Sequence, residues 1–161
     1  MKRIPLLSCA ALATVLVLGG CQTSSSSDTT ASPPAAATTA GLASTKWQLV
    51  GFQSMDDAQG TTKPGEGRVY TLEFGADGAL AMQLDCNRGR TSWTTRDSGP
   101  EGGTLVIGPI ATTRAMCEQP DIGQMMSARL SEVASYTLRN GHLFLALKMD
   151  SGIFEFAPLQ P

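Results

Sequence analysis

The stretch RVYTLEFGADGALAMQLDC, residues 68–86, decides the fold because it predicts a β-hairpin. Apolar and polar residues alternate on both sides of the turn segment GADG (75–78). A period of two places alternate side chains on one face of a strand, so one face of the hairpin is expected to be buried. The residues expected on that face are Tyr70, Leu72, Phe74, Leu80, Met82, Leu84 and Cys86.

Short apolar segments of the same kind recur on either side of this hairpin. KWQLVGF (46–52) precedes it, and GTLVIG (103–108) follows it. Near the end of the chain, Asn140-Gly141 is a strong two-residue turn signal between strands, and residues 150–152 supply another turn. Segments of this length, separated by Gly, Asp and Asn, predict an antiparallel β protein.

The period changes in PDIGQMMSARLSEVASY, residues 120–136. Five apolar residues fall at the spacing of one helix face, and Asp121 is the expected N-cap. The five are Ile122, Met125, Met126, Leu130 and Val133. We therefore expect an α+β fold, in which one main amphipathic helix packs on an antiparallel β-sheet or partial barrel.

The first residues predict a secretory signal. A basic start precedes an apolar run over residues 4–18, and small residues follow. The segment LGGC (18–21) resembles the lipobox of bacterial lipoproteins, in which the cysteine is acylated and the chain is cut before it. We expect a signal peptide over residues 1–20 and a lipid on Cys21, which would anchor the protein to a membrane. An ordinary cleavage site beside a chance cysteine is the alternative.

Residues 21–44 predict a tether between this lipid and a folded domain. They are mainly Ser, Thr, Ala and Pro, with no large apolar residue before Leu42. Such a segment cannot bury enough surface to repay its ordering entropy, so we expect it to be flexible; a structured arm is the alternative. Residues 45–158 have the length of one domain. Because Gln22 is not the Asp of an inner-membrane retention signal, the expected location is the periplasmic side of the outer membrane, in the envelope of a two-membrane bacterium.

Two of the four cysteines remain for the domain. Cys9 lies in the signal peptide and Cys21 carries the lipid, which leaves Cys86 and Cys117. Disulfides persist in an oxidising periplasm, so we expect these two to pair. A free or redox-active thiol is the alternative, although the usual C-x-x-C redox motif is absent from the sequence.

The sequence offers little for catalysis or for charged ligands. The only histidine, His142, follows a turn and is expected to be exposed. Sequence motifs of metalloproteases, α/β-hydrolases and phosphate-binding loops are absent, and a zinc site needs ligands beyond two cysteines. The formal net charge is −2 and the arginines are scattered. We expect no catalytic residues, no cofactor, no metal and no nucleic-acid partner.

Several segments together resemble the META domain family, which includes heat-shock lipoproteins. They are Trp47 with Leu49, Cys86-Asn87-Arg88, the segment IATTRAMC (110–117) and the final strands, within residues 45–157. The resemblance implies a compact antiparallel fold with one helix and, in many members, a linked cysteine pair. It names no reaction, because members are associated with heat shock, envelope integrity, drug tolerance, secretion or motility. Asp85 stands where the family often has Gly, which leaves open whether the backbone adopts a special conformation there.

These observations favour a non-catalytic, membrane-anchored envelope lipoprotein with a protein-interaction or envelope-stress role. We expect an envelope protein as its partner. The candidate interaction site is Asn87, Arg88 and Arg114, because a disulfide would rigidify two loops that both carry arginine.

Two other functions stay open at the level of the sequence. A periplasmic carrier or sensor of a small apolar ligand would use a cavity between sheet and helix. The residues to line it are Met82, Met125, Met126 and Leu130, for which ordinary core packing is the simpler interpretation. An enzyme would use Asp85, Arg88 and Arg114 near the cysteine pair, although strand-end charges often serve only local hydrogen bonds.

Overall fold

The computed structural model describes residues 41–159, apart from the side chain of Asp97. The expected signal peptide (residues 1–20), the lipidation site Cys21 and the expected linker as far as residue 40 lie outside the described residues. Among the helices that are described, none is long and apolar enough to span a membrane.

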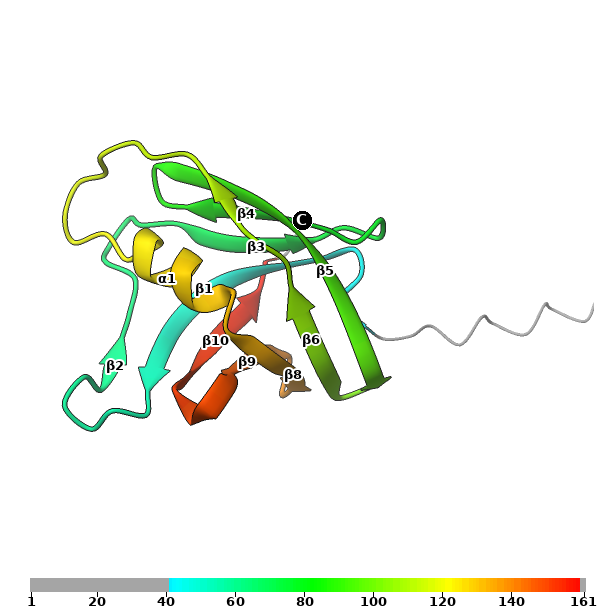
Figure 1. The fold of residues 1–161 in the computed structure, drawn as a ribbon. Coiled ribbons are helices and arrows are strands. Elements are labelled where there is room, and N and C mark those ends of the chain that lie inside the picture. Colours follow the sequence, from blue (N-terminus) through cyan, green and yellow to red (C-terminus); the bar gives the residue numbers. More distant parts are fainter. Residues whose placement is uncertain (1–40, 160–161) are drawn as a thin grey trace, which may run out of the picture. The chain divides into compact units, whose positions relative to one another are not determined.

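Eight antiparallel strands close into a barrel (Figure 1). In spatial order they are β1 (Thr45–Ser54), β3 (Tyr70–Phe74), β4 (Ala79–Leu84), β5 (Asn87–Gly99), β6 (Gly102–Ile107), β8 (Val133–Arg139), β9 (His142–Leu147) and β10 (Gly152–Pro158). The last strand, β10, pairs with β1 in a register that runs from Trp47 opposite Pro158 to Ser54 opposite Gly152. This pairing joins the two ends of the domain and closes the sheet.

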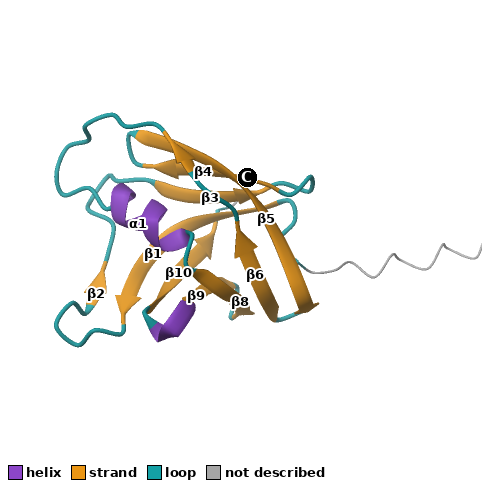
Figure 2. Cartoon of the chain, in the orientation of Figure 1, coloured by secondary structure: helices purple, strands orange, loops and turns teal. Residues whose placement is uncertain are grey.

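The remaining elements are short. β2 (Thr61–Thr62) pairs with β1, and β7 (Ala111–Thr112) pairs with β5. The helix α1 (Gly123–Leu130) and a 3₁₀ turn at Lys148–Asp150 are the helical segments of the described chain (Figure 2). Figure 1 shows α1 lying across the barrel between β4 and β8.

The expected α+β class is wrong, because the fold is an all-antiparallel closed barrel with one eight-residue helix. The helical spacing of the sequence continues to Val133, but this residue begins β8. An apolar residue at that position satisfies the spacing of a helix and the inner face of a strand equally well, so the pattern overstated the helix. The expected partial barrel is closed by β1 and β10.

The hairpin expected at residues 68–86 is confirmed as β3 and β4, with Leu72 opposite Met82. Its apolar face lies in the core, except that Cys86 follows the end of β4 and is exposed. The core also takes buried residues from β1, β6, β8, β9 and β10, while β5 adds the partly buried Trp93. Leu42, which precedes β1, is fully buried in the core. From α1 the core takes Met126 and Leu130, which are fully buried as well.

The strand β5 was not expected from the sequence. It joins β4 on one side to β6 and β7 on the other. Apart from Trp93, which packs edge-on against Phe74, its inward positions hold Gly89 and threonines rather than large apolar residues, so they show no strong strand pattern. Gly89 lies opposite Met82, and a Cβ at this position would stand 2.5 Å from Met82 Cγ, so any other residue would force the buried Met82 side chain to move.

Candidate functional site

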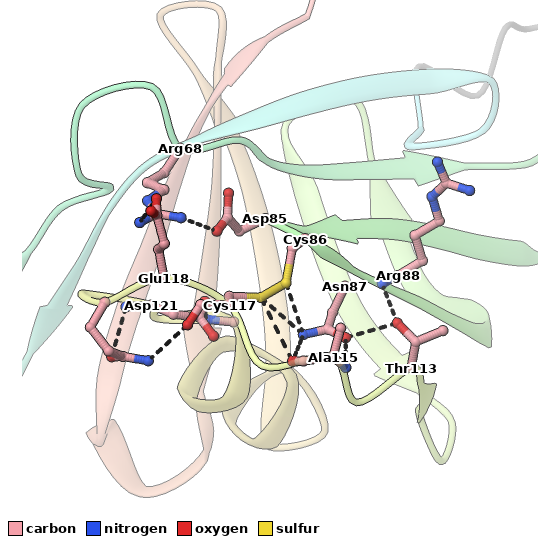
Figure 3. Close-up of a disulfide and its surroundings, with 12 residues drawn as sticks. Arg68, Asp85, Cys86, Asn87, Arg88, Thr113, Ala115, Cys117, Glu118 and Asp121 are labelled. Atoms are coloured by element: carbon pink, nitrogen blue, oxygen red, sulfur yellow. Dashed lines mark hydrogen bonds and ion pairs between the residues drawn. A yellow bond between two sulfur atoms is a disulfide. The ribbon is translucent and has the colours of Figure 1, made fainter.

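A disulfide joins Cys86 to Cys117 at one end of β5 (Figure 3). Cys86 lies in the turn between β4 and β5, and Cys117 lies in the long segment between β7 and α1. Their Cα atoms are 5.7 Å apart, across a sequence separation of 31 residues. The expected pair is therefore present, and it fastens the segment 113–121 to the barrel. We call this segment the disulfide loop.

The side chain of Asn87 fastens the same loop a second time. Its Nδ2 donates to the carbonyl oxygen of Ala115 at 2.9 Å, and its Oδ1 accepts from the Ala115 nitrogen at 2.7 Å. Nδ2 also lies 3.1 Å from Cys117 Sγ, and Oδ1 accepts from Thr113 Oγ1 at 2.9 Å. The side-chain amide of Asn87 therefore takes the place of a neighbouring strand, because it donates to and accepts from the loop backbone.

Asp85 makes the turn that brings Cys86 into position. Its φ is +57°, a left-handed conformation that Asp tolerates better than most residues. The special backbone conformation is thus present although the residue is not glycine. The carboxylate accepts from Arg68 Nη1 at 2.6 Å, and the two side chains are 13% and 17% exposed. Arg68 also reaches Glu118 of the disulfide loop at 3.5 Å.

The far end of the loop is fastened through Tyr70 on β3. Its hydroxyl donates to Asp121 Oδ1 at 3.0 Å and accepts from the Ile122 nitrogen at 3.2 Å. Asp121 Oδ1 also accepts from the Gly123 nitrogen at 2.8 Å, so it serves the start of α1, although Ile122 rather than the expected Asp121 is the N-cap. Burial raises the pKa of the Tyr70 hydroxyl, and the charge of Asp121 adds to the effect.

A hollow of about 660 Å³ lies beside the disulfide loop. One side is formed by the loop and the end of β7, and the other by the start of α1. Arg114 and Met116 are exposed, and the Met116 side chain is 100% exposed. The lining residues are Asn87, Thr112, Thr113, Arg114, Ala115, Met116, Cys117, Gln119, Asp121, Gly123, Gln124 and Ser127.

The structure brings two of the three expected interaction residues to this hollow. Asn87 and Arg114 line it. Arg88 does not: it stands opposite Gln83 on the outer face of the barrel, and only its backbone contacts the loop, through Thr113. Sequence reasoning missed Thr113 and Ala115, which act through backbone groups and a small hydroxyl and carry no recognisable signal.

A metal ion does not suit the acidic groups near the disulfide. Ligand atoms of Asp85, Cys117 and Asp121 lie within 4.8 Å of one another. However, Cys117 Sγ is bonded to another sulfur and offers no thiolate. Asp85 is paired with Arg68, and Asp121 is engaged by Tyr70 and α1. This donor set is therefore satisfied by the protein itself.

The fold and this fastened loop define a small β-barrel domain, and the chain belongs to the META domain family, whose pattern it matches over residues 40–158. A protein from Burkholderia xenovorans solved by NMR is 22% identical, with a TM-score of 0.56 over 74% of this chain and 85% of that one. A DUF4847 family protein from Bacteroides vulgatus is 16% identical, with a TM-score of 0.50 over 72% and 93%. At these identities the two structures share the fold alone. No curated protein sequence matches the chain.

Proposed function

We propose that this protein is a non-catalytic, membrane-anchored envelope lipoprotein whose META domain docks onto another envelope protein. The docking surface is the disulfide loop with the hollow beside it. A role under envelope stress fits such a module, because it would act by holding a partner rather than by turning over a substrate.

The observation that carries the proposal is a fully exposed methionine on a loop that is fastened on both sides of it. Met116 is 100% exposed, between Ala115, which Asn87 holds, and Cys117, which the disulfide holds. A single exposed apolar side chain is ordinary by itself, but Met116 also lines the hollow beside the loop, and concave surfaces are the usual places for binding sites. A loop that is already ordered loses little conformational entropy when a partner binds, which favours affinity.

The proposed location rests on the sequence before residue 41. A lipid on Cys21 would attach the chain to the membrane, and the tether that follows would let the domain reach a partner. The disulfide supports an oxidising compartment, since such bonds persist in the periplasm and are rare in the cytosol. We place the anchor in the outer membrane, with the domain facing the periplasm.

The chemistry of the described residues supports a binding role over catalysis. Both domain cysteines are consumed by the disulfide, which leaves no thiolate nucleophile. His142 is half-buried on β9, where its Nδ1 lies 2.7 Å from Glu155 on β10. Of the residues expected to line an apolar cavity, Met82, Met126 and Leu130 are buried in the core, which does not favour the carrier hypothesis.

Photo-crosslinking in intact cells tests the docking surface. A photoreactive amino acid replaces Met116 in one variant and Met149 in another, since Met149 is 96% exposed in the turn between β9 and β10. We expect defined envelope proteins to be captured through position 116 and not through position 149. Equal capture at both positions, or none at position 116, would overturn the proposal.

A second arm separates binding from folding. Arg114→Ala should reduce the recovery of the same partners several-fold while the melting temperature stays unchanged, because the exposed Arg114 side chain makes no ion pair within the described residues. Unchanged recovery would remove this side chain from the docking surface.

A further inference from the structure

The disulfide loop continues β7 as an extended edge that bonds β5 on one side only. The Thr113 nitrogen donates to the Arg88 carbonyl oxygen at 2.9 Å, and the Ala115 nitrogen donates to Asn87 Oδ1 at 2.7 Å. Alternate residues of an extended chain direct their backbone groups to opposite sides. The backbone groups of Thr112, Arg114 and Met116 therefore point away from β5. We call these three residues the free edge.

The free edge borders the hollow, and all three of its residues line it. Within residues 41–159, the backbone nitrogens of Arg114 and Met116 have no hydrogen-bond partner. Across the hollow stand Gln124 and Ser127 of α1. A volume of about 660 Å³ lies inside the usual range for binding clefts, about 300–1,000 Å³. The hollow therefore offers both space and unpaired backbone groups to an incoming chain.

The charge of the hollow selects the kind of chain. Its charged lining residues are Arg114 and Asp121. The Asp121 carboxylate accepts hydrogen bonds from Tyr70 and from the start of α1, whereas no ion pair engages Arg114 among the described residues. Arg114 is exposed and Asp121 is partly buried, so the charge that an incoming chain meets along the free edge is positive. Met116, two residues further along the same edge, adds an apolar contact.

We propose that the free edge accepts an extended segment of the partner as an added β-strand, with an acidic side chain against Arg114 and an apolar side chain two residues away against Met116. Strand addition obtains affinity from backbone hydrogen bonds and specificity from alternate side chains. This inference rests on the proposed function and names the chemistry of its partner. A second copy of this chain suits the edge poorly, since a two-fold pairing of identical edges would bring two Arg114 side chains together.

Synthetic peptides measure the side-chain preference. The full chain, purified in detergent, is titrated with labelled seven-residue Thr/Val peptides that carry Glu and Leu two positions apart, or Lys in place of Glu. We expect the Glu peptides to bind more tightly, and Arg114→Glu to weaken them at least about tenfold and to favour the Lys peptides, because like charges then meet. Arg96→Glu, at an exposed arginine further along β5, should change binding less than about twofold.

Backbone methylation tests the strand geometry itself. Two further versions of the best peptide carry N-methyl groups on alternate residues, in opposite phase. We expect one version to lose binding and the other to keep it, because an added strand pairs with the edge through every second residue. Hydrogen exchange at the amides of Arg114 and Met116 should slow only when a binding peptide is present.

Each other outcome overturns the inference. If no peptide binds, if both methylated versions keep binding or if both lose it, the free edge is not a site of strand addition. The result is separable from the broader proposal: partners captured through position 116 without binding of any peptide would leave the docking surface in place and remove only strand addition. Loss of capture at position 116 would remove the docking surface itself.

Discussion

The side-chain amide of Asn87 meets both backbone groups of Ala115, with Nδ2 2.9 Å from its carbonyl oxygen and Oδ1 2.7 Å from its nitrogen. This is the exchange that two paired residues make in an antiparallel sheet, except that one partner is a side chain. Asn87 therefore extends the pairing of β7 with β5 beyond the end of β7. The opposite side of the loop is left as the free edge, so the residue next to the disulfide determines what the loop can bind.

Replacing Asn87 tests this arrangement. Asn87→Ala leaves the Ala115 nitrogen and carbonyl without partners, and should lower the free energy of unfolding by about 1–3 kcal/mol. Asn87→Asp is the matched control, because it keeps the acceptor for the Ala115 nitrogen and loses the donor. Hydrogen exchange at the Ala115 amide should accelerate in the alanine variant and stay slow in the aspartate variant. Equal exchange in the wild type and the alanine variant would contradict the role assigned to Asn87.

Removal of the disulfide should cost more. In the chain-entropy description, a link across 31 residues stabilises the folded chain by roughly 3–4 kcal/mol. The double variant Cys86→Ala/Cys117→Ala should therefore lose about that much in urea denaturation. The wild type under reducing conditions is the control, and it should unfold at a similar urea concentration. A double variant as stable as the oxidised wild type would show that hydrogen bonds alone hold the loop.

The sequence pattern predicted the hairpin β3–β4 because a period of two is local and needs no partner. It could not predict closure of the barrel, since β1 and β10 stand at opposite ends of the domain and neither shows in its own pattern which strand it will join. The predicted helix was also too long, since it was extended to Val133, which begins β8. A strand and a helix both need an apolar residue there, and only the tertiary structure decides between them.

In the candidate site, too, the sequence predicted some features and could not predict others. The cysteine pair followed from counting cysteines by compartment, and Asn87 and Arg114 were selected because they stand near it. What Asn87 does could not be read from residue types, because its main partner is the backbone of Ala115. Arg88 was selected on the same ground as Arg114, but in a strand the direction of a side chain depends on register, and β5 was not expected.

The two tyrosines should respond to loss of their hydroxyls with opposite signs. Tyr70→Phe leaves the Ile122 nitrogen without its acceptor and removes one of the two donors to Asp121 Oδ1, and should lower the free energy of unfolding by about 1–3 kcal/mol. Tyr136 is 2% exposed, and its hydroxyl has no partner among the described residues. Tyr136→Phe removes a buried unpaired group, so it should raise stability by about 1 kcal/mol. Urea denaturation of the two variants measures both changes. A loss of stability in Tyr136→Phe would contradict the assignment of its hydroxyl as unpaired.

The raised pKa of Tyr70 gives stability a pH dependence at the alkaline end. In the unfolded chain this hydroxyl loses its proton near its ordinary pKa of 10.0, and in the folded chain only at higher pH. Between these two pKa values the folded state holds more protons than the unfolded state, so the free energy of unfolding falls as pH rises. Well below pH 10.0 the hydroxyl is protonated in both states, and its contribution to stability is complete. The stability difference between the wild type and Tyr70→Phe should therefore shrink from about pH 9 to about pH 11. A constant difference over that range would show that the pKa is not raised.

The turn at Asp85 separates a backbone effect from an ion pair. Asp85→Gly and Asp85→Ala both remove the contact to Arg68, but only glycine adopts a φ of +57° without steric cost. Because the lost ion pair is common to both variants, the difference between them reports the backbone alone. We expect the glycine variant to be more stable than the alanine variant by about 1 kcal/mol, since a left-handed conformation costs an L-residue roughly 1–2 kcal/mol and the freer unfolded chain of glycine offsets part of this. Urea denaturation of the two variants measures the difference. Equal stabilities would mean that the turn relaxes when the carboxylate is gone, and Arg68 rather than the local backbone would then be what holds Asp85 in place.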